Sequence, residues 1–137
     1  RRQHLVEKVL PALEKGYIVI CDRFVDSSLA YQGFARNLGI DEIYDINMFA
    51  INNKWPDITI LLDIDPEVGL SRIMSNRKQE VNRLDLEGLN FHNKVHQGYE
   101  IIKEKYADRI TLVDGNNSPE VVFNEVYSLI KNKINEH

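Results

Sequence analysis

A short apolar run ends in two charged residues in the sequence Tyr17-Ile18-Val19-Ile20-Cys21-Asp22-Arg23-Phe24. The run is rich in β-branched and aromatic side chains, which is typical of a strand buried in a parallel sheet. Arginine offers a charged planar fork for phosphate oxygens, and a carboxylate accepts a proton or holds metal-bound water. An aspartate and an arginine directly after a strand therefore suit phosphate chemistry. The same pair also fits a structural ion pair at the sheet edge, and the dipeptide alone leaves both interpretations open.

Helical and strand patterns alternate on both sides of this run. Apolar residues recur at helical spacing over 5–13, where Pro11 is predicted to kink or split the helix. Asp41 and Asp65 are the expected caps of two later helices, and Ser118-Pro119-Glu120 is the expected start of the last helix. Beyond the run we expect two further strands, over 58–64 and 110–113, and helices over 27–33, 41–52, 66–75, 86–107 and 119–135. This alternation predicts an α/β fold with a mostly parallel sheet, in which ligands bind beyond the carboxyl ends of the strands.

The composition fits a single domain of an ordinary intracellular protein. The chain has 137 residues, of which 43% are hydrophobic and 28% charged, with a net charge of −4. That charge balance argues against nucleic-acid binding through a broad basic face. Cys21 is the single cysteine, so there is no internal disulfide framework; it is expected to be a small core residue in a reducing compartment. No apolar run is long enough for a membrane span, and we expect a cytoplasmic protein with no membrane contact.

A longer block around the charged pair resembles a known family. Asp22-Arg23-Phe24 followed by Ser27-Ser28-Leu29-Ala30-Tyr31-Gln32-Gly33 resembles the DR(Y/F)xxSSxAYQG block of bacterial thymidylate kinases. Weaker matches occur in the family's order and spacing: Arg1-x-x-His4-Leu5, Pro11-Ala12-Leu13, Pro56-Asp57, Gly69-Leu70-x-Arg72, and Asn82-Arg83-Leu84-Asp85 followed by Phe91 and Tyr99. The resemblance covers essentially the whole chain. It implies a three-layer P-loop kinase-type fold and an enzyme that transfers the γ-phosphoryl group of ATP, with Mg²⁺, to dTMP, giving dTDP for dTTP synthesis.

The resemblance assigns the charged pair to catalysis. It implies that Arg23 grips the dTMP phosphate. It also implies that Asp22 lies near the 5′ phosphate and the magnesium hydration shell, where it positions the acceptor or takes part in its proton balance.

Four residues are implied to bind the nucleoside. Arg1 matches a family arginine that hydrogen-bonds a thymine carbonyl, and Ser28 and Gln32 would address the base edge from the other side. Tyr31 would pack beside the sugar, where its ring disfavours a ribose 2′-hydroxyl. On the residues alone, Tyr31 also fits an ordinary core position and Ser28 a helix start.

The stretch 73–86 resembles the family's lid, which closes over the ATP phosphates. Arg72, Arg77 and Arg83 are the candidates for stabilising charge there, with Arg77 and Arg83 assigned to catalysis and Arg72 to ATP binding. A charged loop that is simply solvated is the alternative for each arginine. The pair Asp114-Gly115 matches the loop that approaches adenine, although such a pair after a strand is also typical of a plain turn.

The chain is expected to be one partial domain with three parts. These are a dTMP-binding part over 1–57, the lid over 73–86, and the C-terminal strand and helices over 87–137. The family forms homodimers through helices, so the first helix and the helix over 41–52 are expected to contribute to a dimer. On the latter helix, Met48, Phe49 and Ile51 fit either core or interface.

His92 and His96 lie four residues apart on a predicted helix, a spacing that suits a metal. No third ligand is evident from the sequence. We therefore predict two exposed histidines and no metal site.

The ATP-binding motif Gly-x-x-x-x-Gly-Lys-[Ser/Thr] does not occur in the chain. In the family it lies upstream of the position of Arg1, so the chain is expected to match the C-terminal two-thirds of such a kinase, with three strands here and two more upstream. Without a central strand, two sheet edges would stay unpaired. We expect the 137 residues alone neither to fold stably nor to turn over ATP. The alternatives are another P-loop nucleoside or nucleoside monophosphate kinase, and a catalytically inactive fragment of the fold.

Overall fold

Two parallel strands form the sheet of the computed structural model, which describes residues 1–75 and 88–136. Strand β1 (Thr59–Asp63) pairs with β2 (Ile110–Asp114) along its whole length, with Asp63 opposite Asp114 at the carboxyl ends. The chain between the strands includes helices, as parallel pairing requires. This arrangement confirms the predicted α/β class and the parallel pairing.

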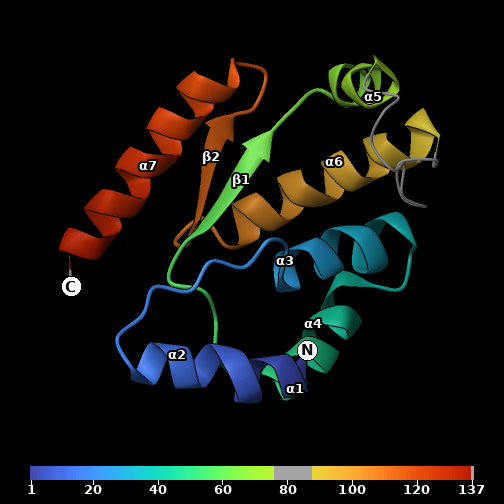
Figure 1. The fold of residues 1–137 in the computed structure, drawn as a ribbon. Coiled ribbons are helices and arrows are strands. Elements are labelled where there is room, and N and C mark those ends of the chain that lie inside the picture. The colour runs from blue at the N-terminus through green and yellow to red at the C-terminus, as the bar shows by residue number, and fades with distance from the viewer. Residues whose placement is uncertain (76–87, 137) are drawn as a thin grey trace.

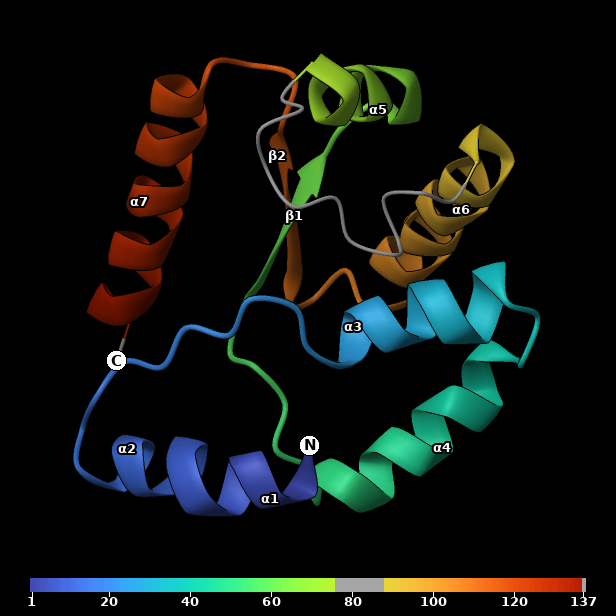
Figure 2. The same cartoon turned by 45° about the vertical axis from the view of Figure 1, so that its right-hand side comes forward.

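Helices lie on both sides of the strand pair, with α7 on one side and α6 on the other (Figures 1 and 2). The C-terminal helices are α5 (Pro66–Ser75), α6 (Leu89–Lys105) and α7 (Pro119–Asn135). The N-terminal part contributes α1 (Arg2–His4), the π-helical segment η1 (Leu5–Val9), α2 (Leu10–Glu14), α3 (Val25–Ser28), the π-helical segment η2 (Leu29–Ala35) and α4 (Ile40–Ile51). None of the described helices is both long and apolar enough to cross a membrane.

Pro11 accounts for the wide π-helical turns that precede it. In a regular helix its ring would clash with the carbonyl group of Glu7, four residues earlier. The helix is instead widened over η1, and the backbone N–H of Leu10 donates to the carbonyl of Leu5. The helix predicted to kink or split at Pro11 is not split: it runs without a break from Arg2 to Glu14, with a π-helical segment directly before the proline.

The main core lies where η2 meets α4 and α6. Leu29, Ile51 and Ile102 are fully buried there. The approach of α6 to η2 requires a glycine, because a Cβ at Gly98 would lie 3.1 Å from Cβ of Phe34 and 3.2 Å from backbone atoms of Ala30. The helical segment η2, which contains the end of the block 22–33, is therefore packed directly against α6.

Residues 17–21 do not form the predicted third strand. Tyr17, Ile18 and Ile20 have exposed fractions of 65%, 64% and 81%, and Cys21 is exposed rather than a core residue. A strand is stable only where a neighbour takes its backbone hydrogen bonds. Among the described residues, β1 pairs with β2 and no strand lies alongside 17–21. The apolar run is therefore irregular.

Two of the three predicted helix starts are correct. The Asp65 carboxylate accepts a hydrogen bond from the backbone N–H of Glu67 at 2.8 Å, and Ser118 caps α7 in the same way through Val121. The predicted cap Asp41 is wrong, because α4 begins at Ile40 after Gly39, which adopts a φ of +89°. A φ in this range favours glycine, so the cap of α4 lies two residues before the predicted one.

Candidate functional site

A buried ion pair joins the start of α3 to the starts of both strands. Arg109 directly precedes β2, and its guanidinium donates to both carboxylate oxygens of Asp26 at 2.7 Å. Thr59, the first residue of β1, donates its hydroxyl to Asp26 at 3.0 Å. The side chains of Arg109 and Asp26 are only 11% and 7% exposed. The contact fixes the chain just after the Asp22-Arg23 pair against the sheet.

Aromatic rings cover the arginine of this ion pair. The guanidinium carbon of Arg109 lies 4.5 Å from the ring centre of Trp55 and 5.0 Å from that of Tyr106. Tyr44 stacks on both of these rings, with centroids 5.6 Å and 6.1 Å away. Cation–π contacts of this kind contribute about 0.5–2 kcal/mol, with the larger values where water is excluded. The stack thus connects α4 to the ion pair.

Arg23 has an unusual backbone conformation for a residue with a side chain. Its φ of +64° is left-handed, which costs a residue with a Cβ about 1–2 kcal/mol. Its guanidinium carbon lies 4.4 Å from the ring centre of Tyr31, and its Nε donates to Ser27 Oγ at 3.4 Å. Strained residues of this kind cluster at functional sites. Arg23 is exposed, so its remaining N–H groups are accessible to an anion.

Tyr31 packs in an aromatic cluster with residues of α6. Its ring meets Phe91 edge-on at a centroid distance of 6.0 Å and Tyr99 at 6.4 Å. The Tyr99 hydroxyl lies 2.9 Å from Ser27 Oγ. Burial raises the pKa of Tyr99, which keeps the phenol neutral near pH 7. Tyr31 is half-buried, so one side of the ring belongs to the core and the rest is accessible.

Arg1 is oriented by side chains from two helices. Its guanidinium donates to Ser28 Oγ at 2.9 Å and to Oδ1 of the buried Asn47 on α4. The guanidinium also lies 5.3 Å from the ring centre of Phe24. Burial lowers the pKa of the Arg1 guanidinium somewhat, although an arginine still stays charged at neutral pH. The structure therefore brings Arg1 against Ser28 and Arg23 against Tyr31, so both arginines lie beside the segment 23–31.

A second group of predicted residues lies at the carboxyl ends of the strands. The two terminal nitrogens of Arg72, on α5, donate to the carbonyl groups of Gly115 and Asn116 at 2.9 and 3.0 Å. Asp114 accepts from the backbone N–H of Asn116 at 2.9 Å, which closes the turn after β2. Gly115 is required, because a Cβ there would lie 2.3 Å from Ile64. Arg72 thus clamps the loop that contains Asp114 and Gly115.

The remaining predicted residues are less constrained by the structure. Asp22 and Gln32 are exposed. Arg77 and Arg83, and most of the predicted lid, lie outside the described residues. On α4, Ile51 is core and Met48 packs against it, whereas Phe49 is 89% exposed.

The two histidines of α6 are not the exposed pair that the sequence predicted. Both are half-buried, and Nε2 of His92 is buried without a hydrogen-bond partner among the described residues. Nε2 of His96 lies 3.0 Å from Oδ1 of Asp63, at the end of β1. His96 therefore contacts a strand carboxylate that is 33 residues away in the sequence.

Sequence reasoning assigned no role to several residues that shape the site. Asn47 and Tyr99 orient Arg1 and Ser27, and Asp26 with Arg109 anchors the segment. The sequence carries little local signal for them, since Asp26 is flanked by Val25 and the polar Ser27. Their partners are distant in the sequence, and no local pattern identifies them.

Comparisons with known proteins point to a single family. The sequence model of the family described as "Thymidylate kinase" matches residues 1–126. The chain is 57% identical over 131 residues to a thymidylate kinase from Clostridium novyi, covering 96% of this chain and 64% of the relative. It is 53% identical to one from Geobacillus thermodenitrificans, covering 98% of this chain and 60% of the relative. It is 54% identical to one from Bacillus cereus strain Q1, covering 98% of this chain and 64% of the relative. The chain thus spans less than two thirds of the length of these curated relatives.

Replacing Asp26 by Asn should strongly destabilise the protein, because it leaves the buried Arg109 guanidinium without a charged partner. Removing one partner of a buried pair typically costs about 3–5 kcal/mol. Asp41→Asn is the matched control, since it removes an ion pair with Lys105 whose aspartate is 82% exposed and should cost under about 1 kcal/mol. Urea unfolding of the two variants measures both values. Equal losses of unfolding free energy would contradict the anchoring role.

Proposed function

Because the chain belongs to the thymidylate kinase family, we propose that it supplies the acceptor site of an enzyme that transfers the γ-phosphoryl group of ATP to dTMP. The observation that carries the proposal is the placement of Arg23. An exposed guanidinium is held over Tyr31 by a strained backbone, directly after Asp22 and on a segment anchored by the buried pair. This arrangement presents a charged fork at one position and limits its freedom, which suits recognition of a phosphate monoester.

Arg23 acts by holding the acceptor phosphate. In the proposed step an oxygen of the dTMP phosphate forms a bond to the γ-phosphorus of ATP, and the bond from that phosphorus to the β,γ-bridging oxygen breaks, releasing ADP. Two anions must approach each other, so a cation on the acceptor offsets their repulsion and fixes the line of attack. Arg23 supplies that charge without needing a proton transfer, since guanidinium stays protonated.

Asp22 is proposed to act beside Arg23. Its exposed carboxylate precedes the arginine and offers the oxygen ligands that Mg²⁺ prefers, most readily through a bound water. Mg²⁺ bound with ATP supplies charge neutralisation at the phosphate oxygens. Asp22 would orient that hydration shell or accept a proton from the acceptor phosphate.

Arg1, Ser28, Gln32 and Tyr31 are proposed to bind the nucleoside. Thymine has two carbonyl acceptors and one N–H donor, and arginine, serine and an amide together complement these groups. The contacts of Arg1 with Ser28 and Asn47 support this proposal, because they fix the guanidinium before the ligand arrives. Tyr31 is held edge-on by Phe91 and Tyr99, so its ring forms a rigid wall for the sugar.

The strand-end group is proposed to border ATP. Arg72 holds the loop of Asp114 and Gly115 through two carbonyl groups, which supports a positioning role for Arg72 on the adenine side. The proposed roles of Arg77 and Arg83, to offset charge on the transferred phosphoryl group, rest on their place in the predicted lid.

The finer fold proposal is a three-layer P-loop kinase with further strands beyond β1 and β2, in a cytoplasmic enzyme. Residues 1–137 alone are proposed to be inactive, so all the experiments use the whole protein.

A homodimer is proposed to form through α4 and the first helix. Phe49 and Ile46 on α4 have exposed fractions of 89% and 66%, and Val6 on η1 is 47% exposed. Both helices lie at the same end of the molecule, away from α5 (Figures 1 and 2). An apolar surface of this kind on two neighbouring helices suits contact with a second copy.

Replacing Arg23 by Ala should lower kcat/KM for dTMP by about 10- to 150-fold, since hydrogen bonds to charged groups contribute about 1.5–3 kcal/mol. The KM for ATP should stay near its original value. Arg72→Ala should show the reverse pattern, with the larger change in the KM for ATP.

Steady-state kinetics with dTMP, dUMP, dCMP and thymidine as acceptors measure these effects and the base preference. Arg2→Ala is the control, because Arg2 is the exposed neighbour of Arg1. An Arg23→Ala enzyme with unchanged dTMP kinetics, or a protein that prefers another acceptor, would contradict the proposal.

Replacing Phe49 by Lys should convert the dimer to monomer, because a charge then lies within the apolar contact. Light scattering coupled to size-exclusion chromatography measures the mass. Phe123→Lys on α7 is the matched control, as Phe123 is also a largely exposed aromatic residue, at 64%, and should leave the dimer intact. A wild-type monomer, or equal effects of the two substitutions, would refute this interface.

A further inference from the structure

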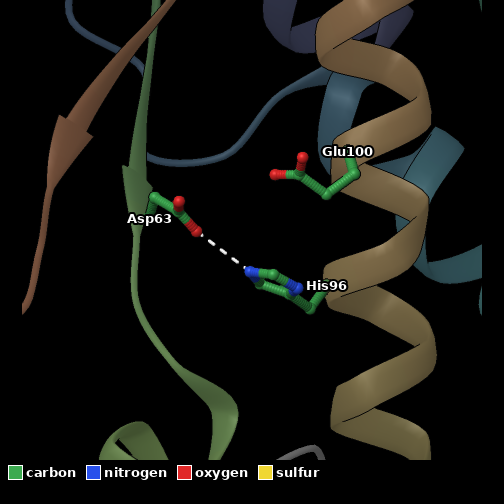
Figure 3. Close-up of side chains that lie close together, drawn as sticks. All are labelled: Asp63, His96 and Glu100. Carbon is green, nitrogen blue, oxygen red and sulfur yellow. Dashed lines mark hydrogen bonds and ion pairs between the residues drawn. The ribbon is translucent and has the colours of Figure 1, made fainter.

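Three potential metal ligands from separate elements meet at the carboxyl end of β1. They are Asp63, the last residue of β1, and His96 and Glu100 on α6 (Figure 3). One ligand atom from each lies within 4.8 Å of the other two. We propose that these residues form a binding site for a single divalent transition-metal ion of the Zn²⁺ type. The site is separate from the proposed acceptor site and does not depend on the proposed function.

The backbone positions of the three ligands are fixed by regular structure. His96 and Glu100 lie four residues apart on α6, so both project from the same face of the helix. Asp63 is held by its pairing with β2, and its carbonyl accepts a hydrogen bond from Gly115 at 2.8 Å. Val95 and Ile102 bury the opposite part of α6 in the core. The ligands therefore converge without rearrangement of the fold.

The distances fit a metal ion after a small side-chain adjustment. Two ligand atoms at about 2.0–2.1 Å from a tetrahedral ion lie roughly 3.3 Å apart. The separation of His96 Nε2 from Asp63 Oδ1 is 3.0 Å, close to this value. The Glu100 side chain faces the same space and is 40% exposed, so a rotamer change suffices to bring its carboxylate nearer (Figure 3). Three protein ligands would leave one coordination position for water.

The ligand set favours a transition metal over Mg²⁺. Imidazole nitrogen suits Zn²⁺, Co²⁺ and Ni²⁺, whereas Mg²⁺ prefers oxygen ligands in octahedral geometry. A hydrogen bond between His96 and Asp63 accounts for their contact without a metal. That hydrogen bond does not explain why a second carboxylate, that of Glu100, lies close to both residues.

Lys103 competes with a metal at this site. Its ammonium group donates to Glu100 at 2.5 Å, and the hydrogen bond and charge of Glu100 raise the pKa of Lys103, with a contribution from Asp63. Two carboxylates beside one ammonium leave an excess of negative charge that a divalent ion can offset. Removing the ammonium should therefore strengthen metal binding. If the His96–Asp63 contact is purely structural, removing the Lys103 ammonium should not change the affinity for the metal.

Titration calorimetry of the whole protein with Zn²⁺ tests the site. We expect one ion per chain, with binding weakened at least about 10-fold in His96→Ala and Glu100→Gln, since even outer-shell changes have effects of this size. Lys103→Met should tighten binding. Mg²⁺ in excess should not displace the Zn²⁺, and the visible spectrum of bound Co²⁺ should show nitrogen and oxygen ligands.

His92→Ala is the matched control, because His92 lies one turn before His96 on the same helix and outside the cluster. It should retain the affinity of the original protein, and thermal unfolding of each variant verifies that it is folded. Absence of Zn²⁺ binding in the original protein, or equal affinities of His96→Ala and His92→Ala, would overturn the proposal. Binding lost in His92→Ala but kept in Glu100→Gln would instead assign the metal to the two histidines and would also overturn it.

Discussion

The bidentate ion pair between Asp26 and Arg109 joins three parts of the chain that would otherwise be independent. It connects the start of α3, the start of β1 through Thr59, and the start of β2. Burial makes each charge costly without the other, so the segments must come together for either charge to be stable. The rings of Trp55 and Tyr106 exclude water from one side of the pair and extend the constraint to the rest of the helical core.

This constraint also determines where the proposed acceptor site lies. Arg23 comes three residues before Asp26, so the strained turn at Arg23 is held from its C-terminal side. The aromatic contacts of Tyr31 with α6 then fix the next turns of the helix. Arg23 and Tyr31 gain a defined orientation from groups that need not touch a ligand. Arg23 is thus held by its neighbours on one side and exposed to solvent on the side where the phosphate is expected.

Local chemistry made much of the fold predictable from sequence. The caps Asp65 and Ser118, the disturbed helix geometry at Pro11 and the two paired strands depend on neighbouring residues. Residues 17–21 show the limit, because an apolar run indicates strand-forming tendency but its hydrogen-bond partner is not encoded nearby. The candidate site divides in the same way. The block from Asp22 to Gln32 was identifiable, whereas the partner of Asp26 is 83 residues away and the contact of His96 with Asp63 crosses the fold.

We propose that a segment anchored by a buried ion pair presents Arg23 to the phosphate of dTMP. The distance between the Arg23 guanidinium and the phosphate oxygens of dTMP, in a crystal structure of the whole protein with this ligand, tests that claim most directly. We expect paired contacts of about 2.7–2.9 Å, with Asp26 and Arg109 still joined and the thymine beside Arg1. A phosphate bound away from Arg23, with the ion pair intact, would contradict it.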